Sequence, residues 1–467
     1  MYDFDKPINR QGTHCVKWDM APHSAPEGAT TLNSPLSARP EGTLSERSGE
    51  RTLNSKLSTL NSQMIPLWVA DMDFEAAPAI RAALQKRVEH GVFGYAIVQD
   101  SYYDAVINWY ERRHQWHIER EWIQYTTGVV PAISAVIKAL TMPGERVLIM
   151  TPVYNCFFSS IRNNGCEVLE SKLVPVSCAP TQEAASPALT YSVDWDDFER
   201  KCADEKCTVF LLCNPHNPAG RVWTREELQR MNDICQRHHV RIISDEIHCE
   251  LVMPGHEFVP MGIMPTPNPS QREGSLNTLS RQDTATEANQ APLPWGGGGG
   301  GLPIICCSPS KSFNTAGLQI ANIICADAET RRRIDRAINI NEICDVNPFA
   351  PLAVEAAYNE SEDWIDELNQ YLWGNYQALL EFFAEQLPQL KVFKLEGTYL
   401  VWVDITALRV SADEIEEKLL REARVWVNSG TMYGADGYIR INIATQRARL
   451  MEGLKRMARV LATCPLT

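Results

Sequence analysis

The chain has 467 residues, a formal net charge of −14 at pH 7 and a sequence pI of about 5.3. This length predicts two or three domains with a large buried core. The acidic balance disfavours a nucleic-acid partner, because such a partner requires a basic face on the protein.

Cysteine usage and hydropathy indicate a reducing compartment and no membrane span. The 14 cysteines include no C-x-x-C pair, and several lie within or beside apolar runs. That distribution is typical of small core residues rather than of a disulfide framework. The first residues are polar, and no run of about 18 apolar residues occurs. We therefore expect a cytoplasmic protein.

Two segments have the composition of surface insertions without fixed structure. Residues 21–63 carry the tetrapeptide TLNS three times, and residues 264–302 include six consecutive glycines. Both are rich in small and polar residues, so they cannot bury enough apolar surface to offset the entropy of ordering. The polar stretch at 175–190 is a third candidate. A binding role for the repeats is the alternative.

Outside these segments, strand and helix patterns alternate. Short apolar runs rich in β-branched residues predict strands that are buried on both faces, as in a parallel sheet. Thr224 and Glu227 form a capping-box pattern at the start of a helix between two such runs, so this region predicts a parallel crossover unit. In chain order the predicted elements are a helix at 132–141, strands at 145–150 and 208–213, a helix at 224–239, a strand at 240–244, helices from about 328 and at 364–387, a strand at 398–405, a helix at 411–423 and a strand at 438–443.

This order of elements predicts an α/β fold with two domains. We expect a large domain over 64–330, with a mostly parallel central sheet between helices and the insertion at about 264–302. Residues 1–20 and 331–467 are expected to form a smaller α+β domain, and 21–63 to form the other insertion.

Several predicted strands end in residues that can carry chemistry. In chain order these are Tyr154, Asn217, Asp245 and Lys311. Taken alone, a lysine is expected to be solvated. Ligands of an open parallel sheet, however, bind at the carboxyl ends of its strands, so a ring, an amide, a carboxylate and an amine are expected to converge on one crevice. A pyridine aldehyde would need such a set.

Two specific motifs accompany these strand ends, WVADMDF at 68–74 and NPHNPAGRVWT at 214–224. SDEIH and SPSK, each a weak signal alone, and stretches such as SPSKSFNTAGLQ, TPVYNCFF and IRINIA add to them. Together they resemble the fold-type I aminotransferases that use pyridoxal phosphate. Within that family they look most like the branch of cystathionine β-lyases and related carbon–sulfur lyases. The resemblance covers nearly the whole chain outside the two insertions.

The resemblance implies a role for each residue at the strand ends. Lys311 would form the Schiff base with the cofactor, and Asp245 would keep the pyridine nitrogen protonated. Asn217 would donate to the ring hydroxyl oxygen, although an asparagine before proline is also a common turn residue. Tyr154 would stack on the ring, with simple core packing as the alternative.

The resemblance also implies a phosphate site and a dimer. Backbone amides of Gly128, Val129 and Val130, at the start of a predicted helix, would hold the phosphate. Ser308 would add a hydroxyl group. Tyr95 resembles the tyrosine that reaches the phosphate of the neighbouring subunit, so a homodimer is expected.

Three further positions carry expectations. Arg440 looks like the clamp for the substrate α-carboxylate, because a guanidinium fork fits a carboxylate with two hydrogen bonds; a surface arginine is the alternative. His248 either contacts the cofactor or lies behind a residue that does. Gln319 occupies the position where many relatives carry a phosphate-pairing Arg or Lys. The phosphate would then depend on backbone amides, Ser308 and Tyr95, or on a basic residue from elsewhere.

The activity implied is that of a pyridoxal-phosphate-dependent β-lyase, which cleaves cystathionine or another cysteine S-conjugate to a thiol, pyruvate and ammonia. An aminotransferase is the alternative, because the first half of its mechanism is identical. A non-catalytic regulator on the same scaffold is disfavoured by the presence of Lys311. The remaining histidines show no metal-ligand spacing and no G-x-G-x-x-G follows a strand, so neither a zinc enzyme nor a dinucleotide site is expected.

Overall fold

The computed structural model of the chain describes residues 1–20, 64–178, 189–264, 301–342 and 345–465. The predicted insertion at 21–63 and nearly all of the one at 264–302 lie outside these residues. A search of the described helices finds none with the length and apolarity needed to span a membrane. The cysteines in the described part of the chain are free thiols.

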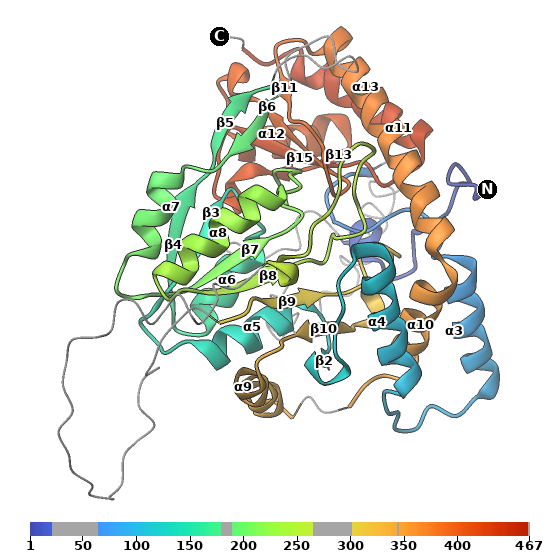
Figure 1. Ribbon diagram of the computed structural model, residues 1–467. Coiled ribbons are helices and arrows are strands. Elements are labelled where there is room, and N and C mark those ends of the chain that lie inside the picture. The colour runs from blue at the N-terminus through green and yellow to red at the C-terminus, as the bar shows by residue number, and fades with distance from the viewer. Residues whose placement is uncertain (21–63, 179–188, 265–300, 343–344, 466–467) are drawn as a thin grey trace, which may run out of the picture.

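A seven-stranded sheet forms the centre of the larger part of the molecule (Figure 1). Its neighbouring strands are parallel except around β10, which is antiparallel to both of its neighbours. The prediction of a mostly parallel sheet is therefore confirmed. In sheet order the strands are β2 (Ile123–Thr126), β10 (Ala321–Ile324), β9 (Ile304–Cys307), β8 (Arg241–Asp245), β7 (Cys207–Cys213), β3 (Arg146–Thr151) and β4 (Glu167–Lys172).

Side chains of the central strands alternate between two hydrophobic clusters, which explains why these strands are apolar throughout. In β7, Val209 and Leu211 belong to one cluster, and Phe210 and Leu212 belong to the other. One face of the sheet is covered by α5 (Val129–Leu140), α6 (Asn155–Asn163) and α9 (Ala328–Asn339), and the other by α7 (Trp195–Cys202) and α8 (Arg225–Arg237). The predicted capping box begins α8: the Thr224 side chain accepts from the Glu227 N–H, and the Glu227 carboxylate accepts from the Thr224 N–H.

The C-terminal third contributes a second, antiparallel sheet. Its strands are, in sheet order, β11 (Lys391–Val392), β12 (Leu400–Asp404), β15 (Tyr438–Asn442) and β14 (Asn428–Ser429). Its helices are α11 (Glu362–Gln386), α12 (Ala412–Lys418), which continues as a π-helical turn over Leu419–Ala423, and α13 (Arg447–Leu461). The predicted elements in this region are thus present within a few residues, whereas the domain boundaries stay a prediction.

The remaining elements join these two parts or lie at their edges. Helix α10 packs against both α3 and α4, beside the central sheet (Figure 1). The polar stretch at 175–190 is not wholly an insertion, because its described ends belong to a hairpin of β5 and β6. The bounds are α1 (Val16–Asp19), β1 (Ile65–Pro66), α3 (Pro78–His90), α4 (Asp100–His114), β5 (Val174–Ser177), β6 (Leu189–Ser192), α10 (Ala350–Glu360) and β13 (Val425–Trp426).

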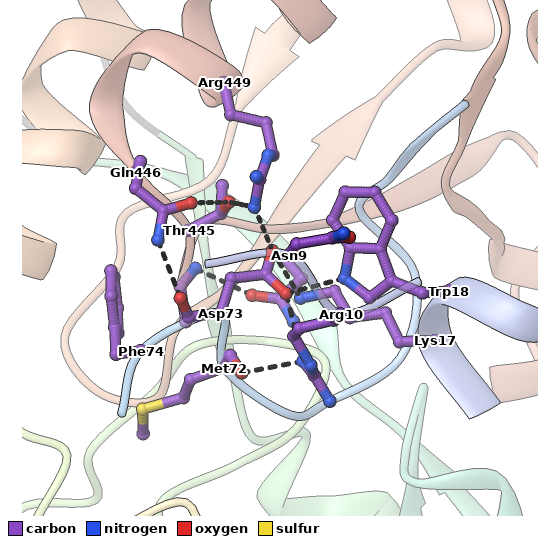
Figure 2. A network of polar contacts seen from close by, with 12 residues as sticks. Asn9, Arg10, Lys17, Trp18, Met72, Asp73, Phe74, Thr445, Gln446 and Arg449 are labelled. Atoms are coloured by element: carbon purple, nitrogen blue, oxygen red, sulfur yellow. Dashed lines mark hydrogen bonds and ion pairs between the residues drawn. The ribbon is translucent and has the colours of Figure 1, made fainter. Parts of the chain in front are cut away.

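A buried carboxylate ties the N-terminal segment to the rest of the molecule. The Asp73 side chain is fully buried, and its oxygens lie 3.0 Å from Arg10, 3.3 Å from Lys17 and 3.4 Å from Arg449. The Trp18 indole N–H donates to it at 2.9 Å. In Figure 2 these side chains point toward Asp73 from separate segments of the chain. Burial opposes ionisation of Asp73, but Lys17, the Trp18 N–H and the two arginines outweigh it and lower its pKa to about 2.

The main chain of Asp73 is also held by hydrogen bonds, in addition to the contacts of its side chain. The Asp73 N–H donates to the Ala444 carbonyl at 2.9 Å, and the Gln446 side-chain amide donates to the Asp73 carbonyl at 2.7 Å. Residues 1–20, the segment after residue 64 and the start of α13 therefore meet at one carboxylate. Removing it would leave Arg449 without an ion-pair partner among the described residues, and Arg10 and Lys17 with Asp71 alone.

Replacing Asp73 with Asn should lower the free energy of unfolding of the apoprotein at pH 7 by about 3 kcal/mol, because three cations lose a buried partner. Urea unfolding measures the change, and Asp335→Asn, at an exposed position in α9, is the matched control.

The pH dependence of this difference has a definite sign. The folded pKa of Asp73 is below that of the unfolded chain, so its contribution is present above about pH 4 and is lost as the pH falls toward 2. The difference between wild type and Asp73→Asn should shrink below about pH 4; a difference of the same size there would contradict the assignment.

Candidate active site

The predicted ring, amide, carboxylate and amine lie at one edge of the central sheet. The strand register pairs Cys213, the last residue of β7, with Asp245, the last residue of β8, and pairs Asp245 with Cys306 of β9. Tyr154 caps α6 just after β3, and its phenol is close enough to Asp245 for their charges to interact. Lys311 follows β9 and interacts electrostatically with Asp245 as well. The structure thus brings these residues together around one crevice.

Lys311 is partly buried, and its amine is anchored to the main chain. Its Nζ donates to the Ala70 carbonyl at 2.6 Å. Burial lowers the pKa of Lys311, and the nearby Arg440 charge lowers it further, while Asp71 and Asp245 oppose the shift. A larger share of the amine is therefore neutral than for a solvated lysine, and the neutral amine is the nucleophilic form.

Asp245 is a buried acid whose charge is poorly compensated. It lies at the end of β8, where its Oδ1 accepts from the Ile247 N–H at 3.2 Å. Burial raises its pKa to about 7, against the effects of this hydrogen bond and of Lys311. Among the described residues no cation lies within ion-pair distance of Asp245. A protonated pyridine nitrogen would supply the missing positive charge, so this residue fits the ring of the expected cofactor.

Arg440 is a buried cation without an anion. It lies on β15, is almost fully buried, and therefore is not a surface arginine. Its Nη1 donates to Asn217 Oδ1 at 3.0 Å, its Nη2 donates to the Trp68 carbonyl at 2.9 Å, and its guanidinium lies 4.7 Å from the centre of the Tyr433 ring. Its Nε is buried without a hydrogen-bond acceptor, and no carboxylate of the described chain pairs with it. A substrate carboxylate would complete the site.

His248 stays neutral in this environment. Burial lowers its pKa to about 3, with further contributions from the charges of Lys311 and Arg440. Its Nδ1 is buried without a partner in the described part of the chain, and its ring packs edge-on against Tyr399 at 6.0 Å. His248 therefore lies beside both basic residues of the site as a neutral imidazole.

The residues expected to hold a phosphate surround the start of β10. Gly128 is the N-cap of α5 with a φ of +155°, which L side chains rarely adopt, and Val129 and Val130 begin the helix. The N–H groups of a first helical turn have no partner within the helix. Thr126 at the end of β2 pairs with Ala321, and Ser308 Oγ donates at 2.6 Å to the carbonyl of Ile320. The Ser308 hydroxyl proton is thus bound within the protein in this structure.

Tyr95, the contact expected to reach a neighbouring subunit, and Gln319, which stands where many relatives carry a cation, are both exposed. Tyr95 is 95% exposed and points away from its own chain's core. Gln319 is exposed at the C-cap of a short 3-10 turn, where its φ is +55°. No cation stands at that position to neutralise a phosphate.

The sequence did not predict the carbonyl groups that bind the basic residues of the site. The segment 68–72 carries the Trp68 acceptor of Arg440 and the Ala70 acceptor of Lys311. Asn442 holds the same segment through hydrogen bonds to the Val69 and Asp71 carbonyls. The specific motif WVADMDF marks this stretch, but the residue types do not indicate which backbone carbonyls accept hydrogen bonds, because every residue has one.

Comparison with known proteins gives a consistent result. Residues 62–457 match the family model described as aminotransferase class I and II. The chain is 34% identical to the cystathionine β-lyase PatB of Bacillus subtilis, over 98% of this chain and 100% of that protein, and 27% identical to the protein MalY of Escherichia coli, over 97% of each.

Solved structures agree with these relatives. Cystalysin of Treponema denticola, which contains pyridoxal 5′-phosphate, is 28% identical with a TM-score of 0.78 and covers 99% of both chains. The PLP-bound C-S lyase of Staphylococcus hominis is 25% identical with a TM-score of 0.74, again over 99% of both chains. These similarities confirm the predicted fold and the predicted family.

Replacing Asp245 with Asn should stabilise the apoprotein at pH 8 by about 3 kcal/mol. Because the folded pKa of Asp245 is about 7, ionisation opposes folding, and stability is lost as the pH rises from about 4 through 7. Asn cannot ionise, so the gain should be full at pH 8 and vanish near about pH 4. Urea unfolding of cofactor-free protein tests this, with Asp335→Asn as control. A variant no more stable than wild type at pH 8 would contradict the assignment.

Proposed function

Because the chain belongs to the class I and II aminotransferase family, we propose that it is a pyridoxal-phosphate-dependent carbon–sulfur β-lyase acting on cystathionine or another cysteine S-conjugate. The observation that carries the proposal is the pair of incomplete charges in one crevice. Asp245 is a buried acid that lacks a cation, and Arg440 is a buried cation that lacks an anion. A cofactor ring and an amino-acid carboxylate would complete both. The choice of a lyase is supported by the relatives, which are named cystathionine β-lyase and C-S lyase.

The cofactor is pyridoxal 5′-phosphate, and the residues of the crevice fit it. When bound, it supplies an aldehyde that condenses with an amine and a ring that accepts electrons released at the substrate Cα. We assign Lys311 as the amine that holds the aldehyde and Asp245 as the partner of the ring nitrogen. Asn217, whose Oδ1 is already bound to Arg440, has its amide N–H groups left for the ring hydroxyl oxygen.

The other assignments follow from position. Tyr154 would cover one face of the ring, and His248 would lie beside it as a neutral group. The amides at Gly128, Val129 and Val130, with Ser308, would receive the phosphate.

The chain's own residues would orient the substrate and move its protons. Arg440 would bind the α-carboxylate with its fork, which fixes the Cα–H direction. Lys311, once its amine is free and neutral, would accept the proton from Cα. Loss of the thiolate from Cβ follows, and with one water the products balance as a thiol, pyruvate and ammonia.

Purified holoenzyme incubated with cystathionine should release pyruvate and ammonia in equal amounts without any added 2-oxo acid. Lys311→Ala should lower this rate by a factor of about 10³ or more, because both the anchor and the base are lost. A coupled dehydrogenase assay follows pyruvate. Turnover that requires a 2-oxo acid would refute the lyase assignment in favour of transamination.

We further propose that two copies of the chain form a homodimer that shares its active sites. The segment 88–97, which covers the end of α3 and most of the loop before α4, exposes several large apolar side chains, which are Val88, Val92, Phe93, Tyr95 and Ile97. Exposed apolar clusters of this kind mark interaction surfaces. A second copy is the occupant that also explains Tyr95, since its phenol would reach the phosphate of the neighbouring site.

Replacing both Phe93 and Ile97 with Asp should convert a two-chain species to a single chain in light scattering after gel filtration, because two charges would be buried in an apolar contact. Met142→Asp, at a comparably exposed apolar position elsewhere, should leave the mass unchanged. A double variant that keeps the mass of two chains would contradict the proposed interface.

A further inference from the structure

The Ala70 carbonyl binds two side chains at once. Lys311 Nζ donates to it at 2.6 Å, and the Tyr399 hydroxyl donates to it at 2.9 Å. A carbonyl oxygen has two lone pairs, so both bonds can form together. The amine and the phenol are therefore neighbours that share one acceptor.

This carbonyl is rigidly held. On one side of Ala70 the Val69 carbonyl accepts from Asn442, and on the other side the Asp71 carbonyl accepts from the same Asn442 side chain at 2.8 Å. The peptide groups on either side of the one that carries the Ala70 carbonyl cannot rotate without breaking these bonds. Its carbonyl thus offers a fixed acceptor for whatever donors lie in the crevice.

Tyr399 is aimed at this acceptor by a strained and crowded backbone. Thr398, the residue before it, is fully buried with a φ of +69°, which is a genuine outlier for a β-branched residue. The Thr398 N–H donates to the Leu251 carbonyl at 2.7 Å. A Cβ on Gly397 would lie 2.8 Å from Val222 and 3.1 Å from the Leu251 carbonyl oxygen. Such strain persists only where the surroundings impose it, and it concentrates at functional sites.

The phenol of Tyr399 stays protonated here and donates its hydrogen to the Ala70 carbonyl. It is fully buried, and burial together with Asp71 raises its pKa, against the effect of Arg440. Its ring packs edge-on against His248. Tyr399 contacts the carbonyl group that holds Lys311.

We propose that Tyr399 is a positioning residue for Lys311, because its hydroxyl shares the Ala70 carbonyl with the lysine amine. The proposal rests on the assignment of Lys311 as the cofactor-binding amine. While the Lys311 amine donates to the Ala70 carbonyl, the Tyr399 phenol donates to the same oxygen and so weakens the lysine's hydrogen bond. When Lys311 leaves to attack an aldehyde, the phenol still donates to this part-buried carbonyl. Tyr399 therefore makes departure of the amine easier.

The consequence for Lys311 has a definite sign. Without the phenol, the carbonyl is a stronger acceptor for the lysine, and an acceptor favours the protonated over the neutral amine. Removal of the hydroxyl should therefore raise the pKa of Lys311 and leave less neutral amine at a given pH. It should also make covalent attachment less favourable, since the part-buried carbonyl would then lose both of its protein donors.

The experiment measures attachment rather than turnover. Apoenzyme is mixed with pyridoxal 5′-phosphate across about pH 6 to 10. The rate at which the cofactor attaches covalently to the protein is followed by absorbance. The modified residue is identified by borohydride trapping and peptide mass spectrometry. For Tyr399→Phe the midpoint of the pH–rate profile should rise by about half a pH unit relative to wild type. Below the midpoint this corresponds to an attachment rate about threefold lower than that of wild type.

Two further variants test this result: one should leave the pH–rate profile unchanged, and the other should shift its midpoint in the opposite direction. Tyr376→Phe removes a buried phenol that donates at the same 2.9 Å to the Phe393 carbonyl, and it should leave the profile unchanged. Tyr399→3-fluorotyrosine keeps the fold and makes the phenol a stronger donor, so its midpoint should move down. This variant also provides the test if Tyr399→Phe does not fold.

The outcomes separate the two proposals. Trapping at a lysine other than Lys311 would overturn the assignment of the cofactor-binding amine. Trapping at Lys311, with a profile for the two Tyr399 variants equal to that of wild type and Tyr376→Phe, would overturn the positioning role alone.

Discussion

The buried ion network at Asp73 is the constraint on which the geometry of the site depends. It fixes the segment 67–74, whose carbonyl groups in turn bind Lys311, Arg440 and Asn442. Two of these three residues belong to the C-terminal sheet, and Lys311 follows a strand of the central sheet, so one short stretch of main chain connects both sheets. Hydrogen bonds to a fixed main chain define position more narrowly than contacts between flexible side chains, because fewer torsions separate donor from scaffold.

The buried charge of Asp73 is balanced by neighbouring cations, whereas the buried charges of Asp245 and Arg440 have no ion-pair partner among the described residues. Asp73 is surrounded by cations and remains ionised well below neutral pH, which strengthens the fold. Asp245 and Arg440 are buried in the same protein without compensation, which costs stability in the free chain. This loss of stability contributes to binding when ligands of opposite charge occupy the site. A site that is electrostatically incomplete by itself therefore indicates binding more strongly than one that is already neutralised.

Much of the fold follows from the sequence, because each central strand is apolar on both faces and the parallel sheet then forces the strand ends together. The positions of Tyr154, Asn217, Asp245 and Lys311 could be predicted in this way. The carbonyl acceptors at Trp68 and Ala70 could not, since every residue has a carbonyl. The positive φ of Thr398 runs against its propensity and is imposed by tertiary contacts. The hairpin of β5 and β6 was missed because polar composition concealed an antiparallel pair.

The proposed role of Tyr399 bears on what separates a lyase from an aminotransferase. Both activities begin with proton removal from Cα; a lyase then loses the thiolate from Cβ, whereas an aminotransferase keeps the side chain and returns the proton at another atom. The Lys311 amine is hydrogen-bonded to the Ala70 carbonyl, and the proposal gives the phenol that shares this carbonyl control over the strength of that bond. If the proposed role of Tyr399 holds, reaction choice would depend in part on a hydrogen bond between protein groups. A variant that loosens or tightens the anchor should change the ratio of products without changing the residues that hold the cofactor.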